Sequence, residues 1–459
     1  MKTTPIKKLV NSVHGRLHSG ESTGVVTSVS TDTRTIGVGS AFFALSGDNF
    51  DAHNFLEKAV AAGACAIVVE RVPAAIHFGD TAVIVVKDTL NALQAFAAWY
   101  IRELDVEVIA ITGSNGKTST KDFTKAVLAE RFKVHATLGN LNNHIGLPLT
   151  VLSTEEDDEV CVLEMGMNHS GEIAPLCQIA KPRIGIITNV GTAHIEFLGS
   201  QQAIAEEKGA LARALPADGV LIVSAACDYA DYFQNHTRAR RIIVGNGRGA
   251  VRAEELRMDK NGSDFLLVID GQEPEKVHLQ VVGRHMIANA LLAAGTGHTL
   301  GMTITQIAAG LNKAILTSGR LRSFQCAGVT VFDDTYNANP ESMMAAIETL
   351  AELKVDTSAQ RYVVLGKMAE LGKHADQASR DVGTLAAERG LGVVTLGDEQ
   401  AEAISMAAAQ SGASAVHFEN IEAAAEWLQS TCVTGDAVLF KGSRAAAMER
   451  VMHKAFPTD

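Results

Sequence analysis

The sequence predicts an α/β protein of three domains. Its 459 residues are enough for about three domains of roughly 150 residues each. A hydrophobic fraction of 47% against 20% charged residues is typical of a folded globular chain. Apolar strand-like segments alternate with helical segments along the whole length. We therefore expect a small α/β module followed by two larger domains built on parallel sheets.

The first segment, residues 1 to about 84, predicts the small module. Its apolar, strand-like runs lie at 25–32, 40–47, 64–70 and 81–86, and one helix is expected over 52–63.

The middle segment, about 85 to 314, predicts a parallel sheet. Near-continuous apolar strands recur between helices, at 107–113, 160–166, 183–191 and 219–225. Strands of this kind are typical of a sheet that helices cover on both faces.

A third series of strands begins near residue 315, after a Ser-Gly break, and continues to 459. Its strands are expected at 329–336, 361–368, 392–398 and 436–442, and alanine-rich helical stretches follow them. No G-x-G-x-x-G follows a strand here, so nothing favours dinucleotide binding.

The stretch ITGSNGKTST, residues 111–120, predicts a phosphate-binding loop between a strand and a helix. It departs from the usual G-x-x-x-x-G-K-[ST] spacing, because Ile111 stands where the first glycine is expected. Gly113 and Gly116 still allow backbone N–H groups to approach phosphate oxygens. Lys117 can reach the outer phosphates, and Thr118 offers a hydroxyl to magnesium. We therefore expect ATP to bind at this helix N-terminus. The middle domain is then expected to be P-loop ATPase-like, and the C-terminal domain that follows it is expected to be Rossmann-like.

Charge and cysteine usage exclude several classes of partner. A net charge of −12 argues against a broad surface for nucleic acid or anionic membranes, because such surfaces need clustered positive charge. No apolar run reaches the roughly 18 residues of a membrane span, and the N-terminus has no apolar core for export. The six cysteines form no C-x-x-C pair, as is typical of thiols in a reducing compartment. We expect a cytoplasmic, monomeric enzyme that is not inserted in a membrane.

Glu164, His194 and Lys208 are candidates for a metal site in the middle segment. Glu164 ends an apolar strand, so its buried carboxylate would need a cation such as magnesium. A structural ion pair would serve equally well, and a lone loop histidine is more often hydrogen-bonded than a metal ligand. Lys208 follows two glutamates, a pattern typical of a solvated helix face. Sequence patterns alone leave these alternatives open.

Longer motifs resemble a known family. The stretches TGSNGKTS, TLGNLNNHIGLPLT, LEMGMNHSGEI, NVGTAHIEFLGS, EEKGAL, GRHMIANALLAA, GRL and DDTYNANPESM occur in the order found in the Mur ligases. The resemblance covers nearly the whole chain. NLNNHIGLPLT, DDTYNANPESM, VVLGKMAELG and KGSRAAAME are most similar to the member that joins D-alanyl-D-alanine to UDP-N-acetylmuramoyl-tripeptide. The resemblance implies an ATP-dependent amide-bond ligase that works through an acyl phosphate in peptidoglycan synthesis, and thus serves cell-wall biogenesis, cell shape and cell division.

The resemblance also implies roles for the candidate residues. Thr118 and Glu164 would hold one magnesium ion, and His194 would lie with Lys208 at a second. Lys208 would carry carbon dioxide as a carbamate, which turns a cationic side chain into an anionic metal ligand. Lys117 would stabilise the transferred phosphoryl group. The expected ATP contacts are Thr112, Gly113, Ser114, Asn115, Gly116, Lys117, Thr118, Ser119, Asn289, Arg320 and Asp334.

The substrate contacts implied by the resemblance fall in all three segments. Residues 1–84 would bind the UDP-sugar-peptide through Ser30, Asp32, Arg34, Gly47, Asp51 and His53. Residues 85–314 would contact the sugar-peptide through Asn140, Asn142 and Asn143. Residues 315–459 would bind the incoming D-alanyl-D-alanine and close on ATP, using Tyr336, Asn337, Asn339, Lys441, Ser443 and Arg444.

Two alternatives share the phosphate loop. One is another ligase of the same superfamily, which would add a single amino acid, or glutamate to folate; the DDTYNANPESM and NLNNHIGLPLT stretches argue against it. The other is a phosphotransferase or a nucleotide-switch binding protein, which would need the loop but no pocket for a carboxylate acceptor.

Overall fold

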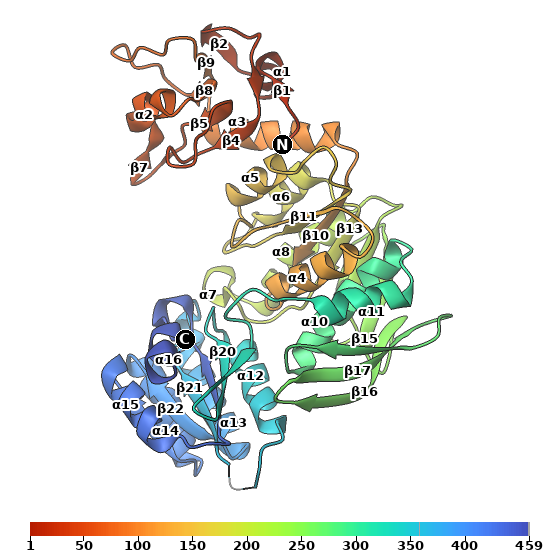
Figure 1. The fold of residues 1–459 in the computed structure, drawn as a ribbon, viewed down its shortest axis with the longest axis vertical. Helices are drawn as coiled ribbons and strands as arrows, with labels where there is room; N and C mark the ends of the chain where they lie inside the picture. Colours follow the sequence, from red (N-terminus) through yellow and green to blue (C-terminus); the bar gives the residue numbers. More distant parts are fainter. Residues whose placement is uncertain (358, 458–459) are drawn as a thin grey trace.

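Three large sheets, one in each domain, divide the described part of the chain into three domains. The structure, a computed structural model, describes residues 1–357 and 359–457. The first domain lies at one end, the middle domain at the centre and the third domain beside the middle one (Figure 1). The three-domain α/β architecture is therefore confirmed. No helix among the described residues is both long and apolar enough to cross a membrane.

The first domain is built on a five-stranded sheet. Its spatial order is β2 (Arg16–Ser19), β9 (Ala82–Val85), β8 (Ala66–Val69), β5 (Ser40–Phe43) and β4 (Ser28–Ser30). Only β2 runs antiparallel to its neighbour. The other elements are β1 (Thr4–Pro5), α1 (Ile6–Ser12), β3 (Val25–Val26), β6 (Ser46–Gly47), β7 (Phe50–Asp51), η1 (Ala52–Phe55) and α2 (Leu56–Ala61).

The first sheet buries both of its faces. Phe42 packs with Leu56 of α2, whereas its neighbour Phe43 points to the opposite face and stacks on Phe96 with ring centroids 6.2 Å apart. Phe96 belongs to α3 (Thr89–Tyr100), which follows β9 and packs against α5 (Gly146–Leu152) and α6 (Ile173–Ala180) of the middle domain. Helix α3 therefore joins the first domain to the second.

The middle domain contains a nine-stranded sheet. Its order is β11 (Val134–Ala136), β12 (Val160–Glu164), β10 (Glu107–Thr112), β13 (Ile184–Ile187), β14 (Val220–Ser224), β15 (Arg240–Asn246), β16 (Val251–Asp259), β17 (Gly262–Ile269) and β18 (Glu275–Leu279). The strands from β11 to β16 are parallel, and β17 and β18 continue the sheet antiparallel. The helices are η2 (Ile101–Glu103), α4 (Lys117–Leu128), α5 (Gly146–Leu152), α6 (Ile173–Ala180), α7 (Ile195–Leu198), α8 (Gln201–Ala214), α9 (Ala230–Asn235), α10 (Arg284–Thr299) and α11 (Ile304–Lys313).

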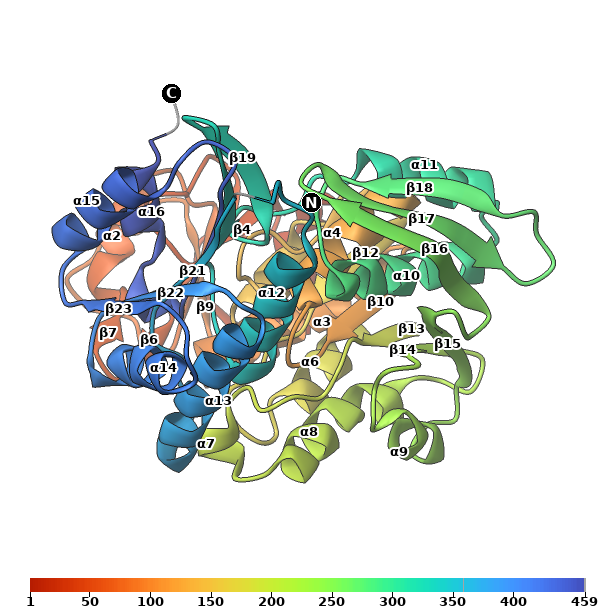
Figure 2. The same cartoon turned by 90° about the horizontal axis from the view of Figure 1, so that it is seen from below.

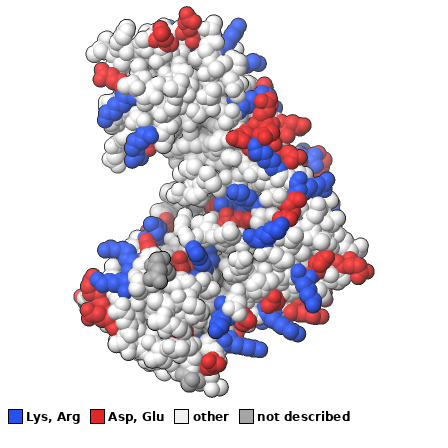
Figure 3. Space-filling view, in the orientation of Figure 1, with Lys and Arg blue, Asp and Glu red and all other residues white. Residues whose placement is uncertain are grey.

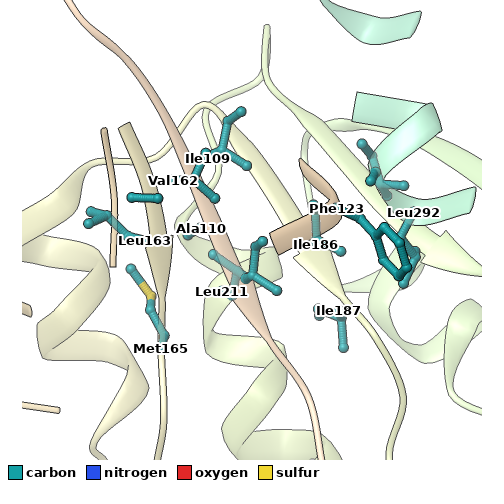
Figure 4. Packing of buried hydrophobic residues seen from close by; sticks show 14 of the residues in the cluster. Ile109, Ala110, Phe123, Val162, Leu163, Met165, Ile186, Ile187, Leu211 and Leu292 are labelled. Carbon is teal, nitrogen blue, oxygen red and sulfur yellow. The ribbon is translucent and has the colours of Figure 1, made fainter. Parts of the chain in front are cut away.

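The centre of this sheet is covered on both faces, as predicted. Ile109 and Ala110 of β10 are fully buried. Leu211 of α8 lies beside Ala110, and Phe123 of α4 lies beside Leu292 of α10 (Figure 4). Burial of an aliphatic or aromatic side chain contributes roughly 1.5–3 kcal/mol. This packing gives the loop after β10 a rigid base.

The strand order places the phosphate loop at a ligand-binding position. After β10 the chain forms β11 and β12 on one side of it, and then β13 on the other. Open α/β sheets bind ligands outside the carboxyl ends of their strands where the order reverses in this way. The loop that follows β10 begins at this point.

The third domain has a six-stranded sheet. Its order is β19 (Arg322–Cys326), β20 (Val329–Asp334), β24 (Ala437–Lys441), β21 (Arg361–Leu365), β22 (Gly392–Leu396) and β23 (Ala415–Phe418). Only β19 is antiparallel. The helices are α12 (Pro340–Glu352), η3 (Gly372–His374), α13 (Ala375–Glu388), α14 (Glu399–Gln410), α15 (Ile421–Thr431), η4 (Arg444–Ala446) and α16 (Glu449–Ala455). Figure 2 shows this domain on the opposite side of the molecule from strands β16 to β18.

Candidate functional site

A cleft of about 1140 Å³ lies between the middle and third domains. Residues at the carboxyl ends of β10, β12 and β13 line it from the middle domain, and residues that follow β20 and β24 line it from the third. Leu90 and Gln94 of α3 reach the same cleft. On the face shown in Figure 3, the molecule is hollowed between the first and third domains, and charged side chains of both signs are interspersed.

Most of the predicted site residues line this cleft. They are Ser114, Asn115, Gly116, Lys117, Thr118, Ser119, Asn140, Asn142, Asn143, Glu164, His194, Asn289, Arg320, Asp334, Tyr336, Asn337, Asn339, Lys441 and Arg444. Thr112, Gly113, Lys208 and Ser443 are buried and are not among its lining residues in the described part of the chain. The predicted residues of the first domain lie outside the lining as well.

The glycines of the phosphate loop are required by close packing. Gly116 caps α4 with a left-handed φ of 78°, and a Cβ there would overlap the side chain of Asn289. Gly113 has a φ of 153°, and a Cβ there would overlap the hydroxyl of Thr188. The first N–H groups of α4 have no partner within the helix and are free to bind an anion.

The loop that follows β13 braces the phosphate loop. Asn189 accepts from Ser114 N through its backbone oxygen (3.1 Å) and from Asn115 N through Oδ1 (2.9 Å). Thr188 Oγ1 donates to Asn115 O (2.5 Å), and Gly191 N donates to Ser114 Oγ (2.9 Å). Asn189 was not predicted, although it lies in the quoted stretch NVGTAHIEFLGS. Its role depends on a contact between two strand ends that no local pattern reveals.

Lys117 folds back onto its own loop. Its Nζ donates to Gly113 O at 2.7 Å and to Ser114 O at 3.4 Å. Burial lowers the pKa of Lys117; Glu164 opposes this shift, and Arg320 adds to it. The ammonium is therefore held against the backbone of the phosphate loop.

Glu164 leaves a buried carboxylate oxygen without a protein donor. The side chain is 3% exposed, and its Oε1 accepts from Asn142 Nδ2 at 2.8 Å. Its Oε2 is buried and has no hydrogen-bond partner among the described residues. A buried, unpartnered carboxylate oxygen is costly, and a hard divalent cation satisfies it well. With the Thr118 hydroxyl in the same cleft, the oxygens present fit magnesium.

Lys208 is buried rather than solvated. It is 1% exposed. Burial lowers the pKa of Lys208 well below its usual value; Lys117 acts in the same direction and Glu207 opposes. Glu207 instead accepts from the backbone N–H groups of Gly171 and Ile173, each at 2.7 Å. The solvated-face interpretation of this helix therefore fails for Lys208.

His194 of the middle domain contacts the third domain. It has a left-handed φ of 64° at the start of α7, and its Nδ1 lies 2.5 Å from Oε2 of Glu370. The neighbouring imidazole of His194 lowers the pKa of Glu370. Glu370 also lines the cleft but was not predicted, even though it lies within the quoted stretch VVLGKMAELG.

Arg320 approaches the phosphate-loop helix from the third-domain side. Its Nη2 donates to Thr118 Oγ1 at 3.3 Å, and its guanidinium carbon lies 4.1 Å from the centroid of the Tyr336 ring. Its Nε is buried without a partner among the described residues. Stacking on the ring fixes the direction of the guanidinium while leaving N–H groups for an anionic ligand.

Asp334 and Lys441 form a buried ion pair at the ends of β20 and β24. Lys441 Nζ donates to Asp334 Oδ2 at 2.6 Å and to Asn337 O at 3.0 Å. Burial raises the pKa of Asp334, although the charge of Lys441 opposes the shift. The cation of Lys441 is thus already neutralised within the protein.

The predicted residues of the first domain form two groups. Ser30 ends β4, and Asp32 and Arg34 lie in the loop that follows, where Arg34 is paired with Asp32 at 2.6 Å. Gly47, Asp51 and His53 belong to the β6–β7 hairpin and its continuation into η1.

The ring nitrogens of His53 are both used inside the protein. Its Nδ1 contacts Asp51 Oδ1 at 2.8 Å, and its Nε2 accepts from Glu70 N at 3.0 Å. His53 is 4% exposed. In this arrangement it supports the hairpin rather than presenting a ring nitrogen.

Comparison with family models matches most of the chain. Residues 25–100 match the Mur ligase family catalytic domain, residues 111–297 the Mur ligase middle domain, and residues 319–444 the Mur ligase glutamate ligase domain. The chain belongs to the Mur ligase family.

Full-length relatives refine the position within the Mur ligase family. The chain is 36% identical over 460 residues to UDP-N-acetylmuramoyl-tripeptide–D-alanyl-D-alanine ligase of Escherichia coli strain K12, and the match covers 98% of each chain. It is 35% identical over 455 residues to the Bacillus subtilis strain 168 enzyme of the same name, with 97% of each covered.

Solved structures of the Mur ligase family agree with this. A crystal structure of MurF from Acinetobacter baumannii superposes with a TM-score of 0.90 at 32% identity, covering 99% of both chains. MurF of Thermotoga maritima in complex with ADP gives a TM-score of 0.83 at 27% identity, covering 93% of this chain and 96% of that one. The resemblance inferred from the motifs is thus confirmed.

Proposed function

We propose that the protein is an ATP-dependent ligase that joins D-alanyl-D-alanine to UDP-N-acetylmuramoyl-tripeptide. The observation that carries the proposal is the cleft itself, in which the phosphate loop, the unpartnered carboxylate oxygen of Glu164 and the third-domain residues face one space. Full-length similarity to enzymes of that name supports the same pair of substrates.

The chemistry explains why ATP is consumed. A carboxylate is a poor electrophile, so an oxygen of the tripeptide carboxylate attacks the γ-phosphorus of ATP while the bond to the ADP oxygen breaks. The amine of D-alanyl-D-alanine then attacks the carbonyl carbon of the acyl phosphate. Phosphate leaves with the bonding electron pair, and the nitrogen loses a proton to give the amide.

The middle domain supplies the phosphoryl-transfer machinery in this proposal. Lys117 and the first turn of α4 bind the phosphates and stabilise charge that develops on them. Thr118 and Glu164 would hold one magnesium ion, and His194 with a carbamate on Lys208 would hold a second. The magnesium ions supply neutralisation of the phosphate charge. The lowered pKa of Lys208 supports the carbamate, because only a neutral amine adds carbon dioxide.

The proposed binding roles follow the domains. Residues 1–84 bind the UDP-sugar-peptide, residues 85–314 bind ATP, and residues 315–459 bind the incoming dipeptide and close on ATP. Asn289 contacts the adenine side, since it packs on Gly116 beside the phosphate loop. Arg320 reaches the nucleotide from the third domain, as its contact with Thr118 supports.

We also infer that the enzyme works as a monomer in the cytoplasm, in peptidoglycan precursor synthesis and therefore in cell shape and division. Consumption of ATP and the free thiols of all six cysteines support a reducing, ATP-containing compartment. Light scattering coupled to size exclusion measures the oligomeric state directly.

An omission assay tests the proposed reaction. Purified protein is given ATP and magnesium with both, either or neither of the two acceptor substrates, and released phosphate and product mass are measured. A ligase releases phosphate at a substantial rate only when both are present and forms one amide per phosphate. Rapid phosphate release without the tripeptide nucleotide, or product with a single amino acid instead of the dipeptide, would favour the alternative functions.

A further inference from the structure

Helix α12 begins where the third domain touches the phosphate loop. Its N-cap residue Asn339 donates from Nδ2 to Oδ1 of Asn115 over 2.7 Å. Asn339 and Ser342 form a capping box, with Pro340 at the first position of the helix, so the start of α12 is held in one conformation. The contact between these two asparagines therefore joins two rigid elements.

Glu341, two residues after the cap, contacts the loop that braces the phosphate loop. Its Oε1 accepts from the backbone N–H of Thr192 at 2.7 Å. Its Oε2 is buried and has no hydrogen-bond partner among the described residues, and the residue lines the cleft. A carboxylate held in this way by one backbone donor is oriented, but it is not fully satisfied by the protein.

Gly191 allows this approach. A Cβ at Gly191 would lie 2.9 Å from Cδ of Glu341 and 3.0 to 3.1 Å from its oxygens, which is closer than ordinary packing. The backbone N–H of the same Gly191 donates to Ser114 Oγ in the phosphate loop. Thr192 therefore binds Glu341, and Gly191, the residue before it, binds the phosphate loop.

We propose that Glu341 is a positioning residue that couples the third domain to the phosphate loop. It holds the loop of residues 188–192 in the conformation that braces Ser114 and Asn115, so the phosphate loop is fully ordered for ATP only while the third domain is docked. The inference rests on the proposed function for its nucleotide, and it extends that function with a residue that links domain docking to ATP binding.

A second carboxylate of α12 provides a matched control. Glu352 Oε1 and Oε2 each accept from Arg284 Nε at 3.0 Å, so this pair also joins α12 to the middle domain. It lies at the opposite end of the helix and does not contact the bracing loop. Loss of Glu352 removes an exposed inter-domain ion pair, and such pairs contribute little to stability. The phosphate loop remains braced in this variant.

The test measures binding of a non-hydrolysable ATP analogue with magnesium by calorimetry. Glu341→Ala is expected to weaken binding about tenfold or more, because a hydrogen bond to a charged group is lost. Glu341→Gln keeps a carbonyl acceptor for Thr192 N, so its affinity for the analogue is expected to stay within about threefold of the wild-type affinity. Glu352→Ala should bind as the wild type does. In turnover, Glu341→Ala should raise the KM for ATP and leave the KM for the tripeptide nucleotide unchanged.

The Gly191→Ala substitution gives an independent test of the proposal. In the wild-type background this substitution should weaken binding of the ATP analogue. In the Glu341→Ala background, where the crowding carboxylate is gone, it should weaken binding much less. The proposal is overturned if the folded Glu341→Ala variant binds the analogue as tightly as the wild type does. It is also overturned if Glu352→Ala weakens binding of the analogue as much as Glu341→Ala does. A wild type that binds the analogue but forms no product would remove the proposed reaction while this binding test still decides the role of Glu341.

Discussion

Lys441 Nζ lies 2.6 Å from Asp334 Oδ2, in a pair whose two side chains are only 4% and 9% exposed. The two residues stand opposite each other in register on the neighbouring parallel strands β20 and β24. Burial raises the pKa of Asp334, and the charge of Lys441, followed by that of Arg320, counteracts this shift, so the Asp334 carboxylate depends on its cationic neighbours. The third domain thus carries a desolvated ion pair at the rim of the cleft.

Asp334→Asn should destabilise the protein by about 3–5 kcal/mol, because it leaves the Lys441 ammonium buried without a counter-charge. The double variant Asp334→Asn/Lys441→Met should recover much of that loss, since neither charge remains. Urea unfolding measures both. Lys367→Met, which breaks the exposed Lys367–Asp398 pair, is the control and should cost less than about 1 kcal/mol. If Asp334→Asn loses no more unfolding free energy than this control does, the pair does not behave as a buried ion pair.

Lys117→Ala and Glu164→Ala should each lower the rate of ligation by about two orders of magnitude or more, as removal of groups that stabilise transferred charge commonly does. Both should remain folded. Lys125→Ala, an exposed lysine on the same helix, should retain activity within about twofold. Steady-state rates at saturating ATP and magnesium provide the measurement. Near wild-type turnover in either site variant would place the chemistry elsewhere.

Local patterns were sufficient to predict the central strands of both large sheets. β10, β12, β13 and β14, and in the third domain β20, β21, β22 and β24, are apolar runs buried on both faces, so their composition alone marks them. Strands β16 to β18 were missed. Exposed charged residues interrupt the apolar residues of β16 and β18, whereas β17, which is mostly buried, was not predicted either.

Part of the site could not be predicted because it depends on contacts between domains. Asn339 and Asn115 are 224 residues apart, and nothing local indicates that they touch. Glu341 and Glu370 lie within stretches that the resemblance singled out, yet their partners Thr192 and His194 belong to another domain. The burial of Lys208 was hidden for a related reason, since its glutamate neighbours are typical of an exposed face.

Lys208→Ala should abolish ligation and keep measurable binding of an ATP analogue, because the phosphate loop itself is unchanged. In crystals of the wild type grown with bicarbonate and magnesium, planar density of three atoms should extend beyond Nζ. Lys208→Met fills the same buried volume and separates the loss of the charged group from the loss of packing. A bare amine at good resolution would remove the carbamate from the proposal.

The third domain should close on the middle one when both nucleotides bind. Arg320 lies in the segment between α11 and β19 and contacts Thr118 across the two domains, so it should favour the closed arrangement. Small-angle scattering should show a smaller radius of gyration on adding an ATP analogue with the tripeptide nucleotide. Arg320→Met should reduce that change. An unchanged radius in the wild type, with both ligands bound, would contradict the closure.

Tyr100→Phe should lower stability by about 1–3 kcal/mol, because the buried carbonyl of Thr154 loses its donor. Burial raises the pKa of Tyr100 to about 12. The unfolded chain ionises near its usual pKa of roughly 10 and the folded chain does not, so wild-type stability should fall as the pH rises from 10 towards 12. The variant should lose this part of the pH dependence. Chemical unfolding at pH 8 and pH 11 provides the measurement, and identical pH dependence in both proteins would contradict the assignment.

The transfer of oxygen from the tripeptide carboxylate to phosphate tests the central claim most directly. UDP-N-acetylmuramoyl-tripeptide labelled with ¹⁸O in its terminal carboxylate is incubated with ATP, magnesium and D-alanyl-D-alanine, and the phosphate and product are analysed by mass spectrometry. Activation through an acyl phosphate predicts one labelled oxygen in each released phosphate and a new amide to the dipeptide. Unlabelled phosphate accompanying amide formation would contradict phosphorylation of the carboxylate, and the absence of amide would contradict the ligase itself.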